Sequence, residues 1–152
     1  PLLEVTEATW DRVMGVDLKG LFFTSQAVLP HLEKSSCPRI VNIASVAGRM
    51  GGYESGFAYT AAKGGVISLT KRMARQVAPK GITINAVCPG TVESDIIKVW
   101  SQEQIDGLKS RIPLNRLGKP VDIAGAVAFL SSEDAAFITG TALDVNGGMF
   151  MG

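Results

Sequence analysis

Tyr59 and Lys63 lie four positions apart in a segment with the pattern Tyr-x-x-x-Lys. On an α-helix, residues i and i+4 share a face, so the phenol and the ammonium are expected to lie side by side. The pKa of a free phenol is about 10 and a neighbouring cation lowers it, so such a pair can serve as a general acid or base. The structural alternative is an amphipathic helix with an interfacial tyrosine and a surface lysine, and for the pair alone this alternative is the stronger one.

Two further features favour the catalytic interpretation. Ser45 ends a predicted strand and precedes Tyr59 across a glycine-rich stretch that lets the chain fold back. Pro89 and Gly90 end the next predicted strand, where a turn can present backbone N–H and C=O groups to a ligand. Ligands of open α/β sheets sit at the carboxyl ends of the strands, so these groups are expected to meet at one edge of a sheet.

The pattern of apolar residues predicts the elements that position these side chains. Helical spacing predicts helices over residues 6–32, 59–78 and 122–130, with a shorter piece near 102–109. Runs rich in β-branched residues predict strands over residues 39–45, 82–88 and 143–145, and clustered glycines predict a loop after the first strand. The alternation of helices and strands predicts a doubly wound α/β sheet of parallel strands joined by right-handed crossovers.

Composition excludes several classes of protein. Of the 152 residues 46% are hydrophobic, and the net charge of +1 gives no electrostatic footprint for nucleic acid or for an anionic membrane surface. No stretch approaches the ~20 apolar residues of a membrane span, and no signal peptide is expected. Cys37 and Cys88 predict two reduced thiols in a cytoplasmic protein, with a secreted disulfide as the alternative. No spacing of His, Cys, Asp or Glu indicates a metal site.

Five ordered motifs give the sequence a family resemblance that covers essentially the whole chain. They occupy residues 16–20, 40–45, 59–63, 85–92 and 144–148. With these motifs the chain resembles the short-chain dehydrogenase/reductase family, and residues 116–148 are similar to its bacterial 3-oxoacyl-carrier-protein reductase-like members. The resemblance implies a Rossmann-type doubly wound parallel sheet, and an assembly into a homotetramer or dimer.

The resemblance implies a catalytic role for four residues. Tyr59 resembles the tyrosine that gives a proton to the carbonyl oxygen in reduction and removes it in oxidation. Lys63 resembles the lysine that holds the nicotinamide ribose and lowers the pKa of the tyrosine, so both residues are also expected to bind the cofactor. Ser45 resembles the serine that orients the substrate oxygen. Asp17 stands where the family usually has an asparagine that holds a water, and its charge is expected to act on Lys63; a locally paired or solvated carboxylate is the alternative.

The resemblance also implies a nicotinamide cofactor, NAD or NADP, that carries the hydride. Pro89, Gly90 and Val92 resemble the segment that lines the nicotinamide, and Ser94 stands where many members have a threonine that bonds the cofactor. The family's glycine-rich phosphate turn is absent, since no two of the 17 glycines lie two positions apart. We therefore expect residues 1–152 to form the catalytic and substrate part of one domain, the second half of the sheet, without the glycine-rich dinucleotide-binding half.

We expect an oxidoreductase that transfers a hydride between NAD(P)(H) and a small-molecule carbonyl or secondary alcohol, with a 3-oxoacyl thioester as the first substrate class. A sugar, polyol or secondary-alcohol dehydrogenase is the alternative within the family, because residues 94–117, which resemble the substrate lid, do not reveal the shape of the pocket. A non-catalytic fragment or binding module is the alternative from another class, and the missing phosphate turn supports it. For the isolated 152-residue chain we expect weak activity or none.

Overall fold

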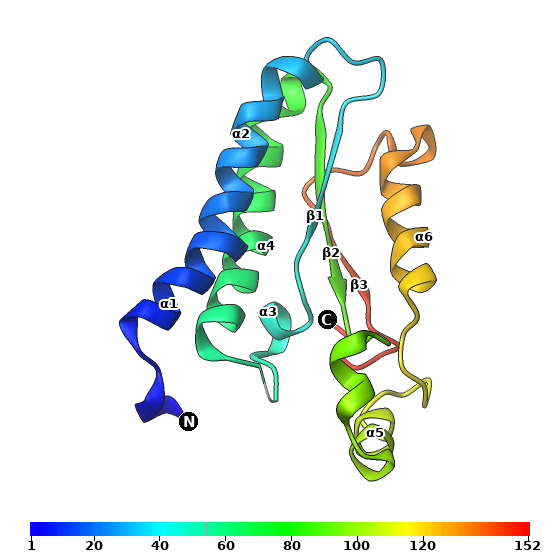
Figure 1. The fold of residues 1–152 in the computed structure, drawn as a ribbon. Coiled ribbons are helices and arrows are strands. Elements are labelled where there is room, and N and C mark those ends of the chain that lie inside the picture. The colour runs from blue at the N-terminus through cyan, green and yellow to red at the C-terminus, as the bar shows by residue number, and fades with distance from the viewer. Residues whose placement is uncertain (54) are drawn as a thin grey trace.

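The computed structural model describes residues 1–53 and 55–152, apart from the side chains of Ile96 and Lys98 (Figure 1). Its helices are α1 (Glu7–Met14), α2 (Leu21–Leu32), α3 (Ala47–Met50), α4 (Phe57–Val77), α5 (Gln102–Lys109) and α6 (Pro120–Ser131). Its strands are β1 (Arg39–Ile43), β2 (Thr83–Pro89) and β3 (Ala142–Val145). A π-helical turn, Gly15–Gly20, joins α1 to α2, and short 3-10 turns cover Leu2–Glu4, Ala78–Lys80, Asp95–Val99 and Glu133–Ala135.

The strands in the described part of the chain form one parallel sheet with the order β1-β2-β3. This arrangement confirms the predicted α/β class with parallel strands. The connection from β1 to β2 runs through α4 on one face of the sheet, and the connection from β2 to β3 runs through α6 on the other face (Figure 1). Both connections step the same way across the sheet but on opposite faces, so they have opposite hands. The prediction of right-handed crossovers throughout is therefore wrong for one of them.

The two faces of the sheet bury different sets of side chains, because successive residues of a strand point to opposite faces. The core toward α2 and α4 contains Leu29, Ile40, Ala74, Val77 and Ile84. The core toward α6 contains Val41, Val87, Ile123, Val127 and Leu130. Because helices cover both faces of the sheet, a site can form at the carboxyl ends of the strands, which they leave uncovered.

The predicted elements are present, with shifted ends. The predicted helix over residues 6–32 is interrupted by the π-helical turn, and the predicted strand over 39–45 ends at Ile43. The short piece predicted near 102–109 is α5, where Ser101 accepts a hydrogen bond from the backbone N–H of Gln104 in a capping box. The glycine-rich stretch predicted as a loop contains α3.

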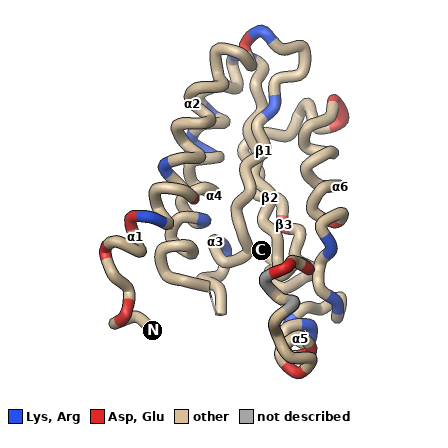
Figure 2. The backbone as a smooth tube through the Cα atoms, viewed as in Figure 1, with Lys and Arg blue, Asp and Glu red and all other residues tan. Residues whose placement is uncertain are grey.

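Charged side chains lie on the helices and connections rather than in the sheet (Figure 2). Among the strand residues, all of which the structure describes, only Arg39 and Asp144 carry a charge. Asp144 is thus the one carboxylate within the sheet. None of the helices in the described ranges is long and apolar enough to cross a membrane.

A buried hydrogen bond fixes α4 against β1. The side-chain amide of Asn42 donates to the hydroxyl oxygen of Thr70 at 2.9 Å, and both side chains are buried. A buried polar group without a partner loses its hydration and regains nothing, so each of these residues needs the other. Together with the apolar packing of α4, the bond sets the face of the helix that meets the sheet, and with it the side on which Tyr59 and Lys63 lie.

We predict that Thr70→Val, which keeps the shape and removes the hydroxyl, lowers the free energy of unfolding by about 1–3 kcal/mol because the Asn42 amide is left unpaired. Thr70→Ser keeps the hydroxyl and is the matched control, with a smaller loss from the missing methyl group. Urea denaturation followed by circular dichroism measures both variants. An equal loss in the two would show that packing, not the hydrogen bond, is what Thr70 supplies.

Candidate active site

Lys63 is the centre of the candidate site. Its ammonium donates to the backbone carbonyl of Ile43 at 3.1 Å and lies 3.1 Å from the Asp17 carboxylate oxygen Oδ1. The same nitrogen lies 5.4 Å from the centre of the Tyr59 ring, so the phenol and the ammonium are neighbours on α4, as the i, i+4 spacing predicts. One cation thus joins three elements at the carboxyl end of β1.

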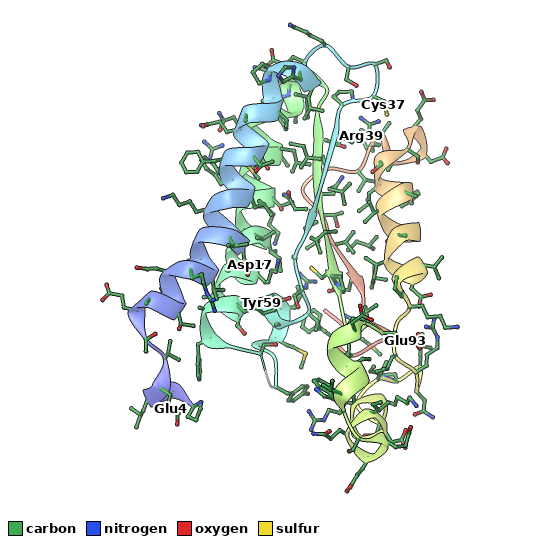
Figure 3. All side chains as sticks on the ribbon, in the orientation of Figure 1. Glu4, Asp17, Cys37, Arg39, Tyr59 and Glu93 are labelled. Carbon is green, nitrogen blue, oxygen red and sulfur yellow. The ribbon has the colours of Figure 1, made fainter. Side chains whose placement is uncertain are left out.

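Asp17 reaches Lys63 from the π-helical turn between α1 and α2. Figure 3 shows Asp17 and Tyr59 near the start of α4. π-Helical turns widen a helix locally and are frequent at functional sites. The turn is held against α4 where Leu18 packs on Gly65, since a Cβ atom at Gly65 would lie only 2.9 Å from the Leu18 side chain. The Asp17 charge thus faces Lys63, as expected, and a part for Asp17 in catalysis stays a prediction.

Ser45 follows β1 and is 9% exposed. Its hydroxyl oxygen accepts a hydrogen bond from the backbone N–H of Ala47 at 3.1 Å, at the start of α3. A hydroxyl accepts through its lone pairs and donates through its hydrogen, so this contact leaves the Ser45 O–H able to donate to a ligand. The structure has one helical turn at residues 47–50, where the sequence predicts a loop, so that prediction is wrong. The Ser45 hydroxyl and the packing of α3 against α4 order this turn.

The helix α3 rests directly on the backbone of α4. A Cβ atom at Gly48 would lie 2.6 Å from the carbonyl carbon of Lys63 and 2.7 Å from the backbone nitrogen of Gly64. Real Cβ atoms do not approach backbone so closely, so only glycine permits this contact. The packing of α3 against this backbone therefore sets the position of Lys63 at the carboxyl end of the sheet.

The turn after β2 joins the same edge. The carbonyl of Pro89 accepts the N–H of Val46 at 2.9 Å, and the N–H of Gly90 donates to the carbonyl of Val145 at 3.1 Å. Gly90 also lies against Asn146, where a Cβ atom would be 2.9 Å from the Asn146 Cα atom. The predicted site residues Pro89 and Gly90 thus lie beside the segment that carries Ser45.

Val92 and Ser94 lie further along the chain from this edge. Val92 pairs with Gly118 as an isolated parallel bridge, and Ser94 precedes the turn Asp95–Val99. Ser94 lines a cavity of about 840 Å³ together with Glu93 and Leu117. Among the residues that the structure describes, no hydrogen bond, ion pair or ring contact joins either residue to Tyr59 or Lys63, so their cofactor roles stay predictions.

A second cavity, of about 210 Å³, lies next to α3. Its walls are mostly apolar and aromatic, and they are formed by Val46, Met50, Gly52, Tyr53, Ser55, Thr91, Trp100, Leu108, Arg111 and Met149. The Arg111 guanidinium lies over the Tyr53 ring, 5.1 Å from its centre, so the segment after α3 and the segment after α5 touch here. Trp100, Leu108 and Arg111 lie in the stretch 94–117 that resembles the substrate lid. Sequence reasoning missed Met50 and Tyr53, because no motif marks them and their contacts join segments far apart in the chain.

Within residues 1–53 and 55–152 no group of three or more His, Cys, Asp or Glu side chains could hold a metal ion. Cys37 and Cys88 are free thiols. Burial, and then the negative charge of Asp144, raise the pKa of Cys88 to about 11. Cys88 is therefore a protonated, apolar core residue under the site.

Comparison with known proteins gives consistent matches. A family model described as "Enoyl-(Acyl carrier protein) reductase" matches residues 1–150. The chain is 47% identical over 151 residues to 3-oxoacyl-[acyl-carrier-protein] reductase FabG of Vibrio cholerae and 43% identical over 151 residues to the protein of that name from Escherichia coli K12. These alignments cover 99% of this chain and 61% of each relative.

A solved structure is similar over the whole chain. It is a short-chain dehydrogenase/reductase from Brucella melitensis, described as a glucose/ribitol dehydrogenase, with a TM-score of 0.91 and 37% sequence identity. The match covers 100% of this chain and 60% of that one. The chain thus spans about three fifths of the length of the relatives that it matches.

From the close contact between α3 and α4 we predict opposite effects on stability when each of its two glycines is replaced by alanine. Gly48→Ala would place a methyl group against the backbone of α4, and we expect a loss of about 1–3 kcal/mol or more in the free energy of unfolding. Gly64→Ala is the matched control from the other side of the contact. Its Cβ atom would meet only the Gly48 carbonyl oxygen at an ordinary 3.6 Å, so the variant is expected to be neutral or more stable by up to about 1 kcal/mol. Similar losses of free energy of unfolding in the two variants would contradict the proposed close packing of α3 against α4.

The two thiols are predicted to react differently with a disulfide reagent at pH 8. With its pKa at about 11, about one Cys88 thiol in a thousand is ionised at this pH, and its side chain is buried. We therefore expect one thiol, that of the half-buried Cys37, to react in the native protein and both to react after unfolding. Cys37→Ser should abolish the native reaction, and a fast native reaction in that variant would show that Cys88 is accessible.

Ionisation of Cys88 also links stability to pH. In the unfolded chain the thiol loses its proton near its ordinary pKa of about 8.5, whereas the native thiol keeps it up to about pH 11. The native state therefore binds more protons in this range, and stability is expected to fall as the pH rises through it. Denaturation midpoints of wild type and Cys88→Ala between pH 8 and 10.5 test this, since the variant should lack this part of the decline.

Proposed function

The chain belongs to the short-chain dehydrogenase/reductase family, and we propose that it is the catalytic and substrate-binding part of an NAD(P)-dependent oxidoreductase. The observation that carries the proposal is the Lys63 ammonium 5.4 Å from the Tyr59 ring, held by the Asp17 carboxylate and the Ile43 carbonyl. The residues given roles are Tyr59, Lys63, Ser45 and Asp17, with Pro89, Gly90, Val92 and Ser94 toward the cofactor.

In the proposed reaction a carbonyl becomes a secondary alcohol. A nicotinamide cofactor held by Lys63 and the residues toward the cofactor would supply the hydride that the carbonyl carbon accepts. The Tyr59 hydroxyl gives its proton to the carbonyl oxygen, and the Ser45 hydroxyl donates a hydrogen bond to the same oxygen, which orients it. The Lys63 cation stabilises the phenolate that Tyr59 becomes. The opposite direction uses the same residues with the proton moved from the alcohol to Tyr59.

The residues of this chain fit the nicotinamide end of such a cofactor. An ammonium has three N–H donors; one of those of Lys63 bonds the Ile43 carbonyl, and Asp17 is its ion-pair partner. An N–H that is not claimed by the Ile43 carbonyl can serve a ribose hydroxyl. The chain carries no glycine pair for a phosphate turn, so we propose that these 152 residues alone bind NAD(P)H weakly and have little activity.

We propose a 3-oxoacyl thioester as the substrate. The walls of the cavity next to α3 are rich in apolar groups, among them Met50, Trp100, Leu108 and Met149, which suit an acyl chain better than a polyol. The relatives named 3-oxoacyl-[acyl-carrier-protein] reductase are 43–47% identical to this chain, which supports the same choice. The solved relative described as a glucose/ribitol dehydrogenase keeps a polyol as the second candidate.

We further propose a cytoplasmic homo-oligomer, a tetramer or dimer. The apolar side chains Val16, Phe23 and Val28 are exposed along the first helical segment, from the π-helical turn to α2. A monomer gains nothing from exposed apolar side chains, whereas a second copy that packs on this segment buries them.

The test uses the protein as its gene encodes it, with any residues that precede Pro1. Wild type should oxidise NADH or NADPH in the presence of a 3-oxoacyl thioester faster than with a polyol-derived ketose. Tyr59→Phe should lower kcat by about 10²- to 10⁴-fold without loss of stability, because the proton donor is removed. Lys63→Ala should be similarly impaired, and Lys71→Ala, an exposed lysine on the same helix, is the matched control. Wild-type rates in Tyr59→Phe would show that Tyr59 is not the proton donor.

A further inference from the structure

A half-buried ion pair joins α3 to β3. The Arg49 nitrogen Nη2 lies 2.8 Å from the Asp144 oxygen Oδ2, and the two side chains are each 20% exposed. The Arg49 guanidinium also lies over the ring of Phe150, 4.8 Å from its centre. Asp144 is the one carboxylate in the sheet, and 95 positions separate the two partners. The contact is thus a long-range link made from residues that are costly to bury.

The geometry of the pair is poor for a purely stabilising contact. Among the described residues, Arg49 Nε and Asp144 Oδ1 are buried and have no hydrogen-bond partner. Buried charges lose their hydration, and a single hydrogen bond repays this incompletely, so apolar residues of similar size are often as stable. The pair therefore calls for a role other than stability.

That role follows from what α3 touches. Its first turn begins next to Ser45, whose hydroxyl accepts the Ala47 N–H, and is tied to β2 through the N–H of Val46, which donates to the Pro89 carbonyl at 2.9 Å. Arg49 ties its end to β3. Gly48, between these ties, rests on the backbone of Lys63. Contacts with β2 and β3 thus hold one helical turn against α4.

We propose that Arg49 and Asp144 are positioning residues, whose ion pair fixes α3 and thereby sets the placement of Ser45 relative to Lys63. The inference rests on the proposed function, because Ser45 and Lys63 matter together only where a carbonyl oxygen and a cofactor meet them. Neither Arg49 nor Asp144 needs to touch the substrate. Their effect is on the geometry of the groups that do, and misplacement by about 1 Å can cost on the order of 100-fold in rate.

The experiment compares Arg49→Met with Arg49→Lys in the protein as its gene encodes it. We expect Arg49→Met to lower kcat by about 100-fold with little change in KM, because transition-state geometry is disturbed more than binding. Arg49→Lys keeps the charge pair and should recover most of the rate. Glu33→Gln is the matched control, since it breaks the exposed Glu33–Lys80 pair and should leave kcat unchanged.

Amide hydrogen exchange gives a readout that does not depend on activity. The amides of Gly48, Arg49, Met50 and Gly51 donate hydrogen bonds within and around α3. Arg49→Met should lose protection at these amides, and Arg49→Lys should keep it. Unchanged protection in Arg49→Met would overturn the anchoring of α3, and wild-type kcat despite lost protection would overturn the positioning role.

A double variant covers the case in which the lone Asp144 charge unfolds Arg49→Met. Arg49→Met with Asp144→Leu leaves no unpaired buried charge, and its unfolding temperature should equal or exceed that of wild type. A low kcat in this stable protein would support the positioning role, and wild-type kcat with wild-type exchange would overturn it. If wild type itself reduces no carbonyl with NAD(P)H, the proposed function fails, while exchange at α3 still decides whether the pair anchors it.

Discussion

The site depends on one steric constraint, the contact of α3 with the backbone of α4. No side chain fits between Gly48 and the peptide group of Lys63, so the two helices meet at backbone distance. Protein interiors are close-packed and deform little, so the position of α3 is transmitted to Lys63 rather than absorbed. Ser45 starts the same turn and is carried with it. One glycine thus couples a residue at the end of β1 to a residue on α4.

Electrostatics then decides where the Lys63 side chain lies. Its ammonium has both a carbonyl and a carboxylate as partners, and the carboxylate comes from a π-helical turn that widens the helix at Asp17. An asparagine at position 17 would offer an amide oxygen but no charge, so the ion pair is a feature of this chain. The pair holds the ammonium beside Tyr59 even without a ligand. The negative charge of Asp17 also offsets part of the positive potential that Lys63 would exert on a Tyr59 phenolate.

The sequence predicted what is local and missed what is tertiary. The Tyr59–Lys63 adjacency follows from helix geometry, and α5 from the helical spacing of its residues, so both could be predicted. The helix α3 could not, because clustered glycines favour a loop and only contacts with α4 and β3 order it. The spacing of apolar residues does not indicate the π-helical turn. No motif links Arg49 to Asp144, so their ion pair could not be predicted either. One of the two crossovers departs in hand from a rule that covers nearly all such connections.

The proposed chemistry also explains why proton transfer and cofactor affinity are separate properties of this fold. A charge-assisted hydrogen bond contributes about 1.5–3 kcal/mol, and Lys63, which already bonds the Ile43 carbonyl and pairs with Asp17, has few such bonds to offer a ribose. Association costs about 4–15 kcal/mol in lost freedom, and even a millimolar complex needs a net gain of about 4 kcal/mol. Contacts at the nicotinamide end therefore orient a cofactor without retaining it. Retention has to come from groups that bind the phosphates, and none of the 17 glycines is spaced for that purpose.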